Sequence, residues 1–546
     1  MKRPLDLADI QGNIVRPYGR FGFPVTRHLF FNIGNAAAGR AFVEEIRHAV
    51  TTAERWAGVD GRANAPARPI VATNVGLSYA GLAALELPTR TLSNMPEEFI
   101  DGMAKRWSIL GDVERSAPDA WDDIWQRAAK VPHADTDEVH IWVSFNSGVG
   151  SDGTPVAALA ERTEWVKAAA ARSGGVTLLT GHKGSSDEYQ DSSAIMKQLP
   201  DGRAAPTAKE NFGFTDGISD PAFAGQYEPA AEAEAVIGGG KLSAGHGEWA
   251  PIATGEFILG HASEAQELQP TAPPWSFTRN GTFMVYRKLH QNVGTFGAYA
   301  DAQAQLLSAI NPALSEEAAK ETVLAKMVGR WQSGIPLEVA PTWDEAQKVA
   351  AEWADVDALY DLPQPTAADK ARIAAYEKML TNFRYKDDVE GARCPVSAHV
   401  RRANPRDALS PTFGTAGSTP DSALTNRRRI MRRGLPYGDP AAKDDTSEHG
   451  VIFIAICASL FRQFEFIQQQ WVQYGSSFNV GNDTDPLAGL RRPGAKFVIP
   501  ADPAKGEAPF ICANIPQFVE TRGGEYFFVP SLTALRQIAS GSVDPT

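Results

Sequence analysis

Alternating strand and helix signals in residues 27–180 constrain the fold more than any other feature of this chain. Residues 27–33 (RHLFFNI) are rich in large apolar residues and alternate, which predicts a strand, and residues 39–50 carry apolar residues at helical spacing. Further strands are expected at 70–75, 139–145 and 176–180, and further helices at 77–85 and 157–171. This order is close to the split βαβ arrangement of ferredoxin-like folds, an antiparallel sheet carrying helices. The sequence therefore predicts an α+β unit.

A second set of similar signals follows a glycine-rich break at 238–240. Strands are expected at 256–259, 282–287, 451–458 and 526–529, and helices at 297–310, 316–327, 367–380 and 460–471. Because 546 residues exceed what one hydrophobic core usually supports, two ferredoxin-like halves are the simplest account. We place them at residues 1–225 and 226–546, with insertions in the second half around 334–366 and 405–448.

Composition excludes several classes of protein. The net charge of −12 disfavours nucleic acid and anionic membrane surfaces as partners. The three cysteines form no CxxC pair, so neither a disulfide framework nor a zinc-thiolate site is expected. The longest apolar run, residues 451–461, is shorter than the roughly 20 residues of a membrane-spanning helix. With acidic residues interrupting the N-terminal stretch, no signal peptide is indicated and a cytoplasmic location is expected.

Three segments are denser in chemically useful residues than a structural role requires. The first, GFTDGISDP at 213–221, fits a tight turn between the two halves. The alternative is functional: Gly213 and Gly217 would let the main chain approach a flat cofactor, with Asp216 held over a pocket. From the pattern alone both interpretations stay open.

The second segment, RCPVSAHVRRANPR at 393–406, sets His399 among small residues and before several arginines. A single histidine is more often a structural residue than a ligand, yet small neighbours leave room for a planar group, and one histidine commonly holds haem iron. An arginine such as Arg406 could pair with haem propionates. The third segment, RRRIMRRGLPYG at 427–438, is either an exposed basic surface or a loop that fixes an arginine over a reaction centre.

The order of these segments resembles the dye-decolourising peroxidases, a family of haem peroxidases. The resemblance rests on GFTDG at 213–217, CPVSAHVRRANPR at 394–406, IMRRGLPYG at 430–438 and LADIQGNIVRPYG at 7–19. Similar stretches extend it over most of the chain: FMVYRKLHQNV, QFEFIQQQW and TRGGEYFFVPS at 283–293, 463–471 and 521–531. The resemblance implies two ferredoxin-like halves, one haem b per chain held mainly by the C-terminal half, and hydrogen peroxide and small reducing molecules as substrates. It leaves a homodimer open.

The resemblance also implies roles for individual residues. His399 would be the proximal iron ligand, Asp216 the distal acid-base and Arg432, rather than its neighbour Arg433, the distal cation. Glu520 is the candidate for a carboxylate that hydrogen-bonds the free imidazole nitrogen of His399. The remaining candidate cofactor contacts are Gly217, Ile218, Ser219, Arg406, Val451 and Phe453. For Val451 and Phe453, a place in the plain hydrophobic core is an equal alternative.

Two other functions compete with peroxidase activity. A haem carrier, sensor or iron-releasing protein could use the same fold. Such a protein needs only the residue that ligates the iron, and the presence of Asp216 together with Arg432 argues against it. A metal-dependent hydrolase could use Asp216, Asp220 and a histidine, but the ten histidines show no HxxxH or comparable ligand spacing. An absorption spectrum separates these classes.

Overall fold

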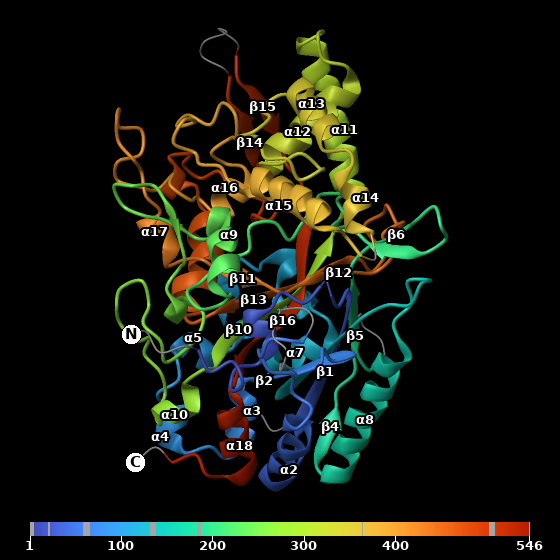
Figure 1. Cartoon of the computed structure of the whole chain (residues 1–546), viewed down its shortest axis with the longest axis vertical. Helices are drawn as coiled ribbons and strands as arrows, with labels where there is room; N and C mark the ends of the chain where they lie inside the picture. Colours follow the sequence, from blue (N-terminus) through green and yellow to red (C-terminus); the bar gives the residue numbers. More distant parts are fainter. Residues whose placement is uncertain are drawn as a thin grey trace.

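One antiparallel sheet runs through the centre of the protein (Figure 1). The computed structural model describes residues 5–19, 22–57, 66–130, 138–182, 187–362, 364–501 and 508–544. The strand order is β11-β13-β10-β16-β2-β3-β1-β4, with β12 paired to β13 and β5 paired to β1. The strands from the first half of the chain are β1 (Val25–Ile33), β2 (Val71–Leu77), β3 (Ile141–Ser147), β4 (Val176–Leu178) and β5 (Gln190–Ser193). Those from the second half are β10 (Thr282–Gln291), β11 (Met431–Arg432), β12 (Leu435–Tyr437), β13 (Gly450–Cys457) and β16 (Val519–Val529).

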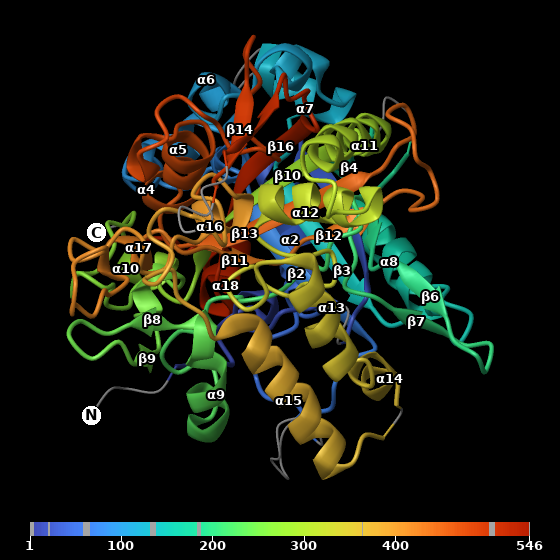
Figure 2. The same cartoon turned by 90° about the horizontal axis from the view of Figure 1, so that it is seen from above.

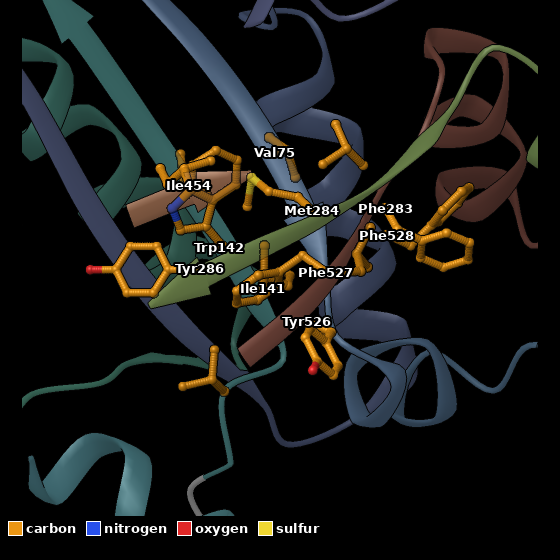
Figure 3. Packing of buried hydrophobic residues seen from close by; sticks show 14 of the residues in the cluster. Val75, Ile141, Trp142, Phe283, Met284, Tyr286, Ile454, Tyr526, Phe527 and Phe528 are labelled. Carbon is orange, nitrogen blue, oxygen red and sulfur yellow. The ribbon is translucent and has the colours of Figure 1, made fainter. Parts of the chain in front are cut away.

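The two sets of strands meet where β16 pairs with β2, at Phe528 and Leu77. Aromatic side chains from both sets pack around this junction (Figure 3). The rings of Trp142 and Phe527 lie 6.2 Å apart, and those of Phe30 and Tyr286 lie 5.2 Å apart. These large rings remove much apolar surface from water, so their burial stabilises the junction. The two halves therefore share one core, and the division at residue 225 stays a prediction.

Helices gather at opposite ends of the molecule. At one end of Figure 1, α18 (Leu532–Ser540) and α8 (Ala157–Ser173) pack against α2 (Ala36–Arg47). At the other end lie α11 (Val293–Ile310), α12 (Glu316–Val328), α13 (Trp343–Glu352), α14 (Val356–Tyr360) and α15 (Ala367–Thr381). Helix α9 (Pro229–Gly239) contacts α15, as Figures 1 and 2 both show. The insertion at 334–366 thus builds helices beyond the sheet, whereas the one at 405–448 also supplies the sheet strands β11 and β12.

Most elements predicted from sequence are present, including all seven within residues 27–180. The strand predicted at 256–259 is wrong. A short 3-10 helix, Thr254–Glu256, is followed there by irregular chain whose residues Phe257, Ile258 and Leu259 are fully buried. A short apolar run signals burial without specifying a conformation, and here the neighbouring core decided the backbone. The helix expected at 460–471 forms two π-helical segments, Phe461–Glu465 and Ile467–Val472.

Candidate active site

A cavity of about 1240 Å³ opens beside the GFTDG segment. Its walls include Asp216 to Asp220 and Arg432 to Pro436, together with side chains from α9, α14 and α15. Residues of both insertions, 334–366 and 405–448, therefore form part of its wall. Of the predicted site residues, Asp216, Gly217, Ile218, Ser219 and Arg432 line this cavity.

The loop that carries Asp216 is fixed by hydrogen bonds on both sides. The Asp216 amide donates to Ala208 O at 2.7 Å, and the Thr215 amide donates to Gln332 O at 3.0 Å. Just after Asp216 the chain turns at Gly217, whose φ of 78° lies in the left-handed region that glycine adopts without strain. The tight turn expected from the sequence is present, and it holds the carboxylate at the cavity wall.

Asp216 and Arg432 form an ion pair across this wall. Oδ1 of Asp216 accepts from Nη1 of Arg432 and from the Gly217 amide. Burial raises the pKa of Asp216, but the charge and hydrogen bond of Arg432 outweigh it, so the pKa lies below its ordinary value. The same interaction raises the pKa of Arg432. The side chains of Asp216 and Arg432 nevertheless keep 48% and 38% of their surface accessible, as expected for groups lining an internal hollow.

His399 begins the short helix α16 (His399–Ala403). Its Nδ1 lies 2.9 Å from Oδ2 of Asp485, whereas its Nε2 has no hydrogen-bond partner among the described residues. Burial lowers the pKa of His399, but the negative charge of Asp485 outweighs this and raises it; Arg432 lowers it and Asp216 raises it further. His399 is not among the residues that line the cavity. The charges of Asp216 and Arg432 are nevertheless close enough to shift its pKa.

Asp485 is the carboxylate at Nδ1, so the prediction of Glu520 for this position is wrong. Glu520 is fully buried on β16 and pairs instead with Arg115 and Arg522, at 3.0 and 2.9 Å. Asp485 is also fully buried, and its Oδ1 accepts from the amides of Leu487 and Ala488. The Asp-Pro-Leu-Ala sequence after position 484 signals such a turn, but nothing local indicates that its second oxygen reaches a histidine 86 residues away.

Arg406 is a buried cation without a carboxylate partner among the described residues. It is 3% exposed and donates to Thr381 O, Phe383 O and Ser219 Oγ, while its Nε has no partner in that part of the chain. Burial lowers the pKa of Arg406. Because an unpaired buried charge is costly, such a guanidinium is suited to receive an anionic group.

Val451 and Phe453 occupy alternate positions on β13. Both are partly exposed, whereas Ile452 and Ile454 are buried, and Phe453 packs against the border of the core shared by the halves. Phe453 packs against Phe464 with ring centroids 6.1 Å apart. Neither Val451 nor Phe453 lines the cavity beside Asp216, and their contact with a cofactor stays a prediction.

The donor set fits a haem iron better than a hydrolytic metal. No group of three or more His, Cys, Asp or Glu side chains suited to a metal ion occurs among the residues that the structure describes. A single histidine with a free Nε2, oriented at Nδ1 by a carboxylate, is instead what a haem iron requires from its protein ligand. With Asp216 and Arg432 nearby, the residues present fit the class of haem peroxidases.

Comparison with known proteins agrees with this class. Residues 9–139 match a family model described as "DyP dimeric alpha+beta barrel domain". The dye-decolorizing peroxidase msp1 of Mycetinis scorodonius is 27% identical over 98% of this chain and 88% of its own length. AauDyP1 of Auricularia auricula-judae is 27% identical over 97% of this chain and 86% of its own length. Over nearly its whole length the chain is similar to peroxidases of the DyP type.

Solved structures show the same fold. The crystal structure of a fungal DyP-type peroxidase from Auricularia auricula-judae superposes with a TM-score of 0.68 at 23% identity, covering 98% of this chain and all of that one. An ancestral D-type dye-decolorizing peroxidase gives a TM-score of 0.69 at 24% identity over the same shares. The predicted α+β fold with antiparallel strands and helices is confirmed. None of the described helices has the length and apolar character needed to cross a bilayer.

Proposed function

We propose that this protein reduces hydrogen peroxide and oxidises dyes, phenols or similar one-electron donors, with one haem b per chain. The observation that carries the proposal is the Asp216–Arg432 ion pair within electrostatic range of His399, whose Nδ1 is held by Asp485. A solved dye-decolorizing peroxidase of the same fold is recorded as a complex with 2,6-dimethoxyphenol, which supports phenols as donors. Each peroxide would take two electrons and two protons from two donor molecules and leave as two waters.

The proximal side would hold the cofactor. Nε2 of His399 would ligate the iron, and Asp485 would fix the tautomer by accepting the Nδ1 proton. Arg406 would receive a propionate, since its buried charge lacks an acidic partner among the described residues. Haem, when bound, would supply the redox chemistry that passes electrons from donor to peroxide.

The distal side would handle the protons. Because the pKa of Asp216 is lowered, its carboxylate is ionised except in acid and can accept a proton from peroxide. The same carboxylate can return this proton to the outer oxygen, which leaves as water. Arg432 keeps its charge throughout and stabilises negative charge on the peroxide oxygens. An inert haem carrier would need neither group.

The test is the second-order rate of the first spectral change with peroxide, measured by stopped flow from about pH 3 to 8. We expect Asp216→Asn to slow the reaction most where the wild-type carboxylate is ionised and to flatten the pH profile. Arg432→Leu should lower the rate on the order of 10²-fold, as expected for loss of one preorganised charge, and should keep the acid limb. Asp355→Asn, in an exposed ion pair with Arg372, is the matched control.

Two outcomes would contradict the proposal. Purified holoprotein that shows a haem absorption band but no spectral change with peroxide would be a carrier rather than a peroxidase. If Asp216→Asn keeps both the wild-type rate and the wild-type pH profile, Asp216 is a structural turn residue and the proton-transfer role is wrong.

A further inference from the structure

Strand β11 and the residue that follows it place two adjacent arginines, Arg432 and Arg433, at the edge of the sheet. The strand contains only Met431 and Arg432, and it pairs on one side with β13. The next amide, that of Arg433, donates to Ile454 O of β13 at 2.8 Å. Successive amides of a strand point in opposite directions, so the Arg432 amide faces away from β13. That outward amide donates to Oδ1 of Asp220 at 3.1 Å, so this carboxylate occupies the place of a neighbouring strand.

The second oxygen of Asp220 binds Arg433. Oδ2 lies 2.7 Å from Nη1 of Arg433, whose side chain is only 3% exposed. Arg433 also donates from Nε to Asn13 O at 2.7 Å and from Nη2 to Ile14 O at 3.2 Å, both on helix α1 (Gly12–Val15). The guanidinium of Arg433 is therefore held between Asp220 and the N-terminal segment, away from Asp216.

Asp216 and Asp220 lie on one sharply turned loop. Gly217 and Ser219 both have positive φ, 78° and 63°, and Ser219 adopts this value without being glycine. The turn brings the two carboxylates to the same strand, so that Asp216 pairs with Arg432 and Asp220 pairs with Arg433. Two ion pairs side by side thus join the loop to β11.

Because Arg432 and Arg433 are adjacent, the register of β11 decides which of them meets Asp216. A slip of a two-residue edge strand by one position exchanges the side chains on its two faces, and Arg433 would then replace Arg432 beside Asp216. Pairing with β13 resists such a slip beyond β11 itself, because β12 pairs with β13 in the same register, but β11 alone contributes only two residues to it. Asp220 opposes it twice, since one oxygen takes the Arg432 amide and the other takes the Arg433 guanidinium.

We propose that Asp220 is a positioning residue, which with Arg433 reinforces the register of β11 on β13 so that Arg432, and not Arg433, meets Asp216 at the cavity. This inference rests on the proposed peroxidase function, because the consequence of the register is the reactivity of Arg432 with peroxide. Asp220 acts through Arg432 and does not itself need to touch peroxide.

The experiment is a double-mutant cycle between Asp220→Asn and Arg432→Leu in the haem-loaded protein. The asparagine keeps the size of the side chain and one acceptor but loses the charge that holds Arg433. We expect Asp220→Asn alone to lower the peroxide rate by about tenfold or more, as small misplacements of reacting groups do. In the Arg432→Leu background the same change should alter the rate by less than about twofold, because the residue through which it acts is gone. Haem content should stay at the wild-type level.

Matched controls separate this role from general loss of stability. Asp201→Asn removes the acid of an exposed ion pair with Arg203, a residue of the same cavity wall, and should leave the rate unchanged. If Asp220→Asn fails to fold, Arg433→Lys serves instead, because lysine keeps the charge but cannot reach Asp220 and α1 together. A wild-type rate in the folded variant, or equal losses with and without Arg432, would overturn the inference. A wild-type protein inert to peroxide would instead overturn the proposed function.

Discussion

Replacing Asp485 with asparagine tests the proximal side of the site most directly. Burial raises the pKa of Asp485, but the charge and hydrogen bond of His399 outweigh it and bring the pKa from 3.8 to about 2. At about 1.36 kcal/mol per pH unit, this net difference is on the order of 2 kcal/mol in favour of the carboxylate. The same attraction acts on His399, because an interaction free energy is shared by both partners.

The magnitude of the expected effect follows from this coupling. A carboxylate at Nδ1 makes His399 more electron-donating and stabilises the higher charge of ferric iron. An energy on the order of 2 kcal/mol corresponds to on the order of 100 mV for a one-electron couple, so Asp485→Asn should raise the ferric/ferrous potential by up to about 100 mV. Asparagine retains an oxygen that can accept the Nδ1 proton, which makes loss of the charge the main change.

Spectroelectrochemical titration of the haem-loaded protein measures this potential. Glu520→Gln is the matched control, because Glu520 is an equally buried carboxylate that pairs with Arg115 and Arg522 instead of His399. We expect its potential to stay within about 20 mV of the wild type, since a charge that is paired with two arginines and not with His399 is largely compensated. An unchanged potential in Asp485→Asn, or a larger rise in Glu520→Gln, would refute the assignment of Asp485.

Two further predictions concern haem retention and stability. His399→Ala should purify with little haem, because the porphyrin loses its protein ligand to iron, whereas exposed His246→Ala should keep a normal Soret band; normal haem content in His399→Ala would contradict the ligand assignment. Burial raises the pKa of Glu525 from 4.5 to about 7, so ionising it costs stability as pH rises from 4.5 to 7. Glu525→Gln, which keeps the oxygen that accepts the Met103 and Tyr526 amides, should therefore raise the free energy of unfolding by up to about 3 kcal/mol at pH 8 and little at pH 4. Urea titrations at both pH values check this, and equal gains at the two would show that ionisation is not the cause.

Local patterns in the sequence were sufficient for most of the secondary structure. The side-chain alternation of residues 27–33 and the helical spacing of 39–50 appear in the structure as β1 and α2. These signals are local, because a strand or helix buries one face at a fixed period. At 256–259 the apolar run indicated burial correctly but the conformation wrongly, since its backbone was set by neighbours distant in sequence.

Short motifs also indicated the segments that hold the candidate site. GFTDG, the His399 segment and the arginine pair could be picked out because small residues, turns and charges concentrate in a few positions. The structure places Asp216 beside Arg432, and both within electrostatic range of His399. The catalytic and cofactor roles of these residues stay predictions until the variants are measured.

Only the tertiary structure decided which partner each of these residues meets. Asp485 rather than Glu520 reaches His399, and Asp220 rather than Asp216 holds Arg433. The sequence around these four carboxylates does not tell their partners apart. A carboxylate needs only one oxygen within hydrogen-bond distance of its partner, and this contact requires no periodic pattern of neighbouring residues. Which carboxylate contacts His399 or Arg433 depends on how β16, the loop after Gly217 and the turn at Asp485 are packed in the fold. A contact across 86 residues, or one across more than 200, is fixed by that packing and not by any local preference of the chain.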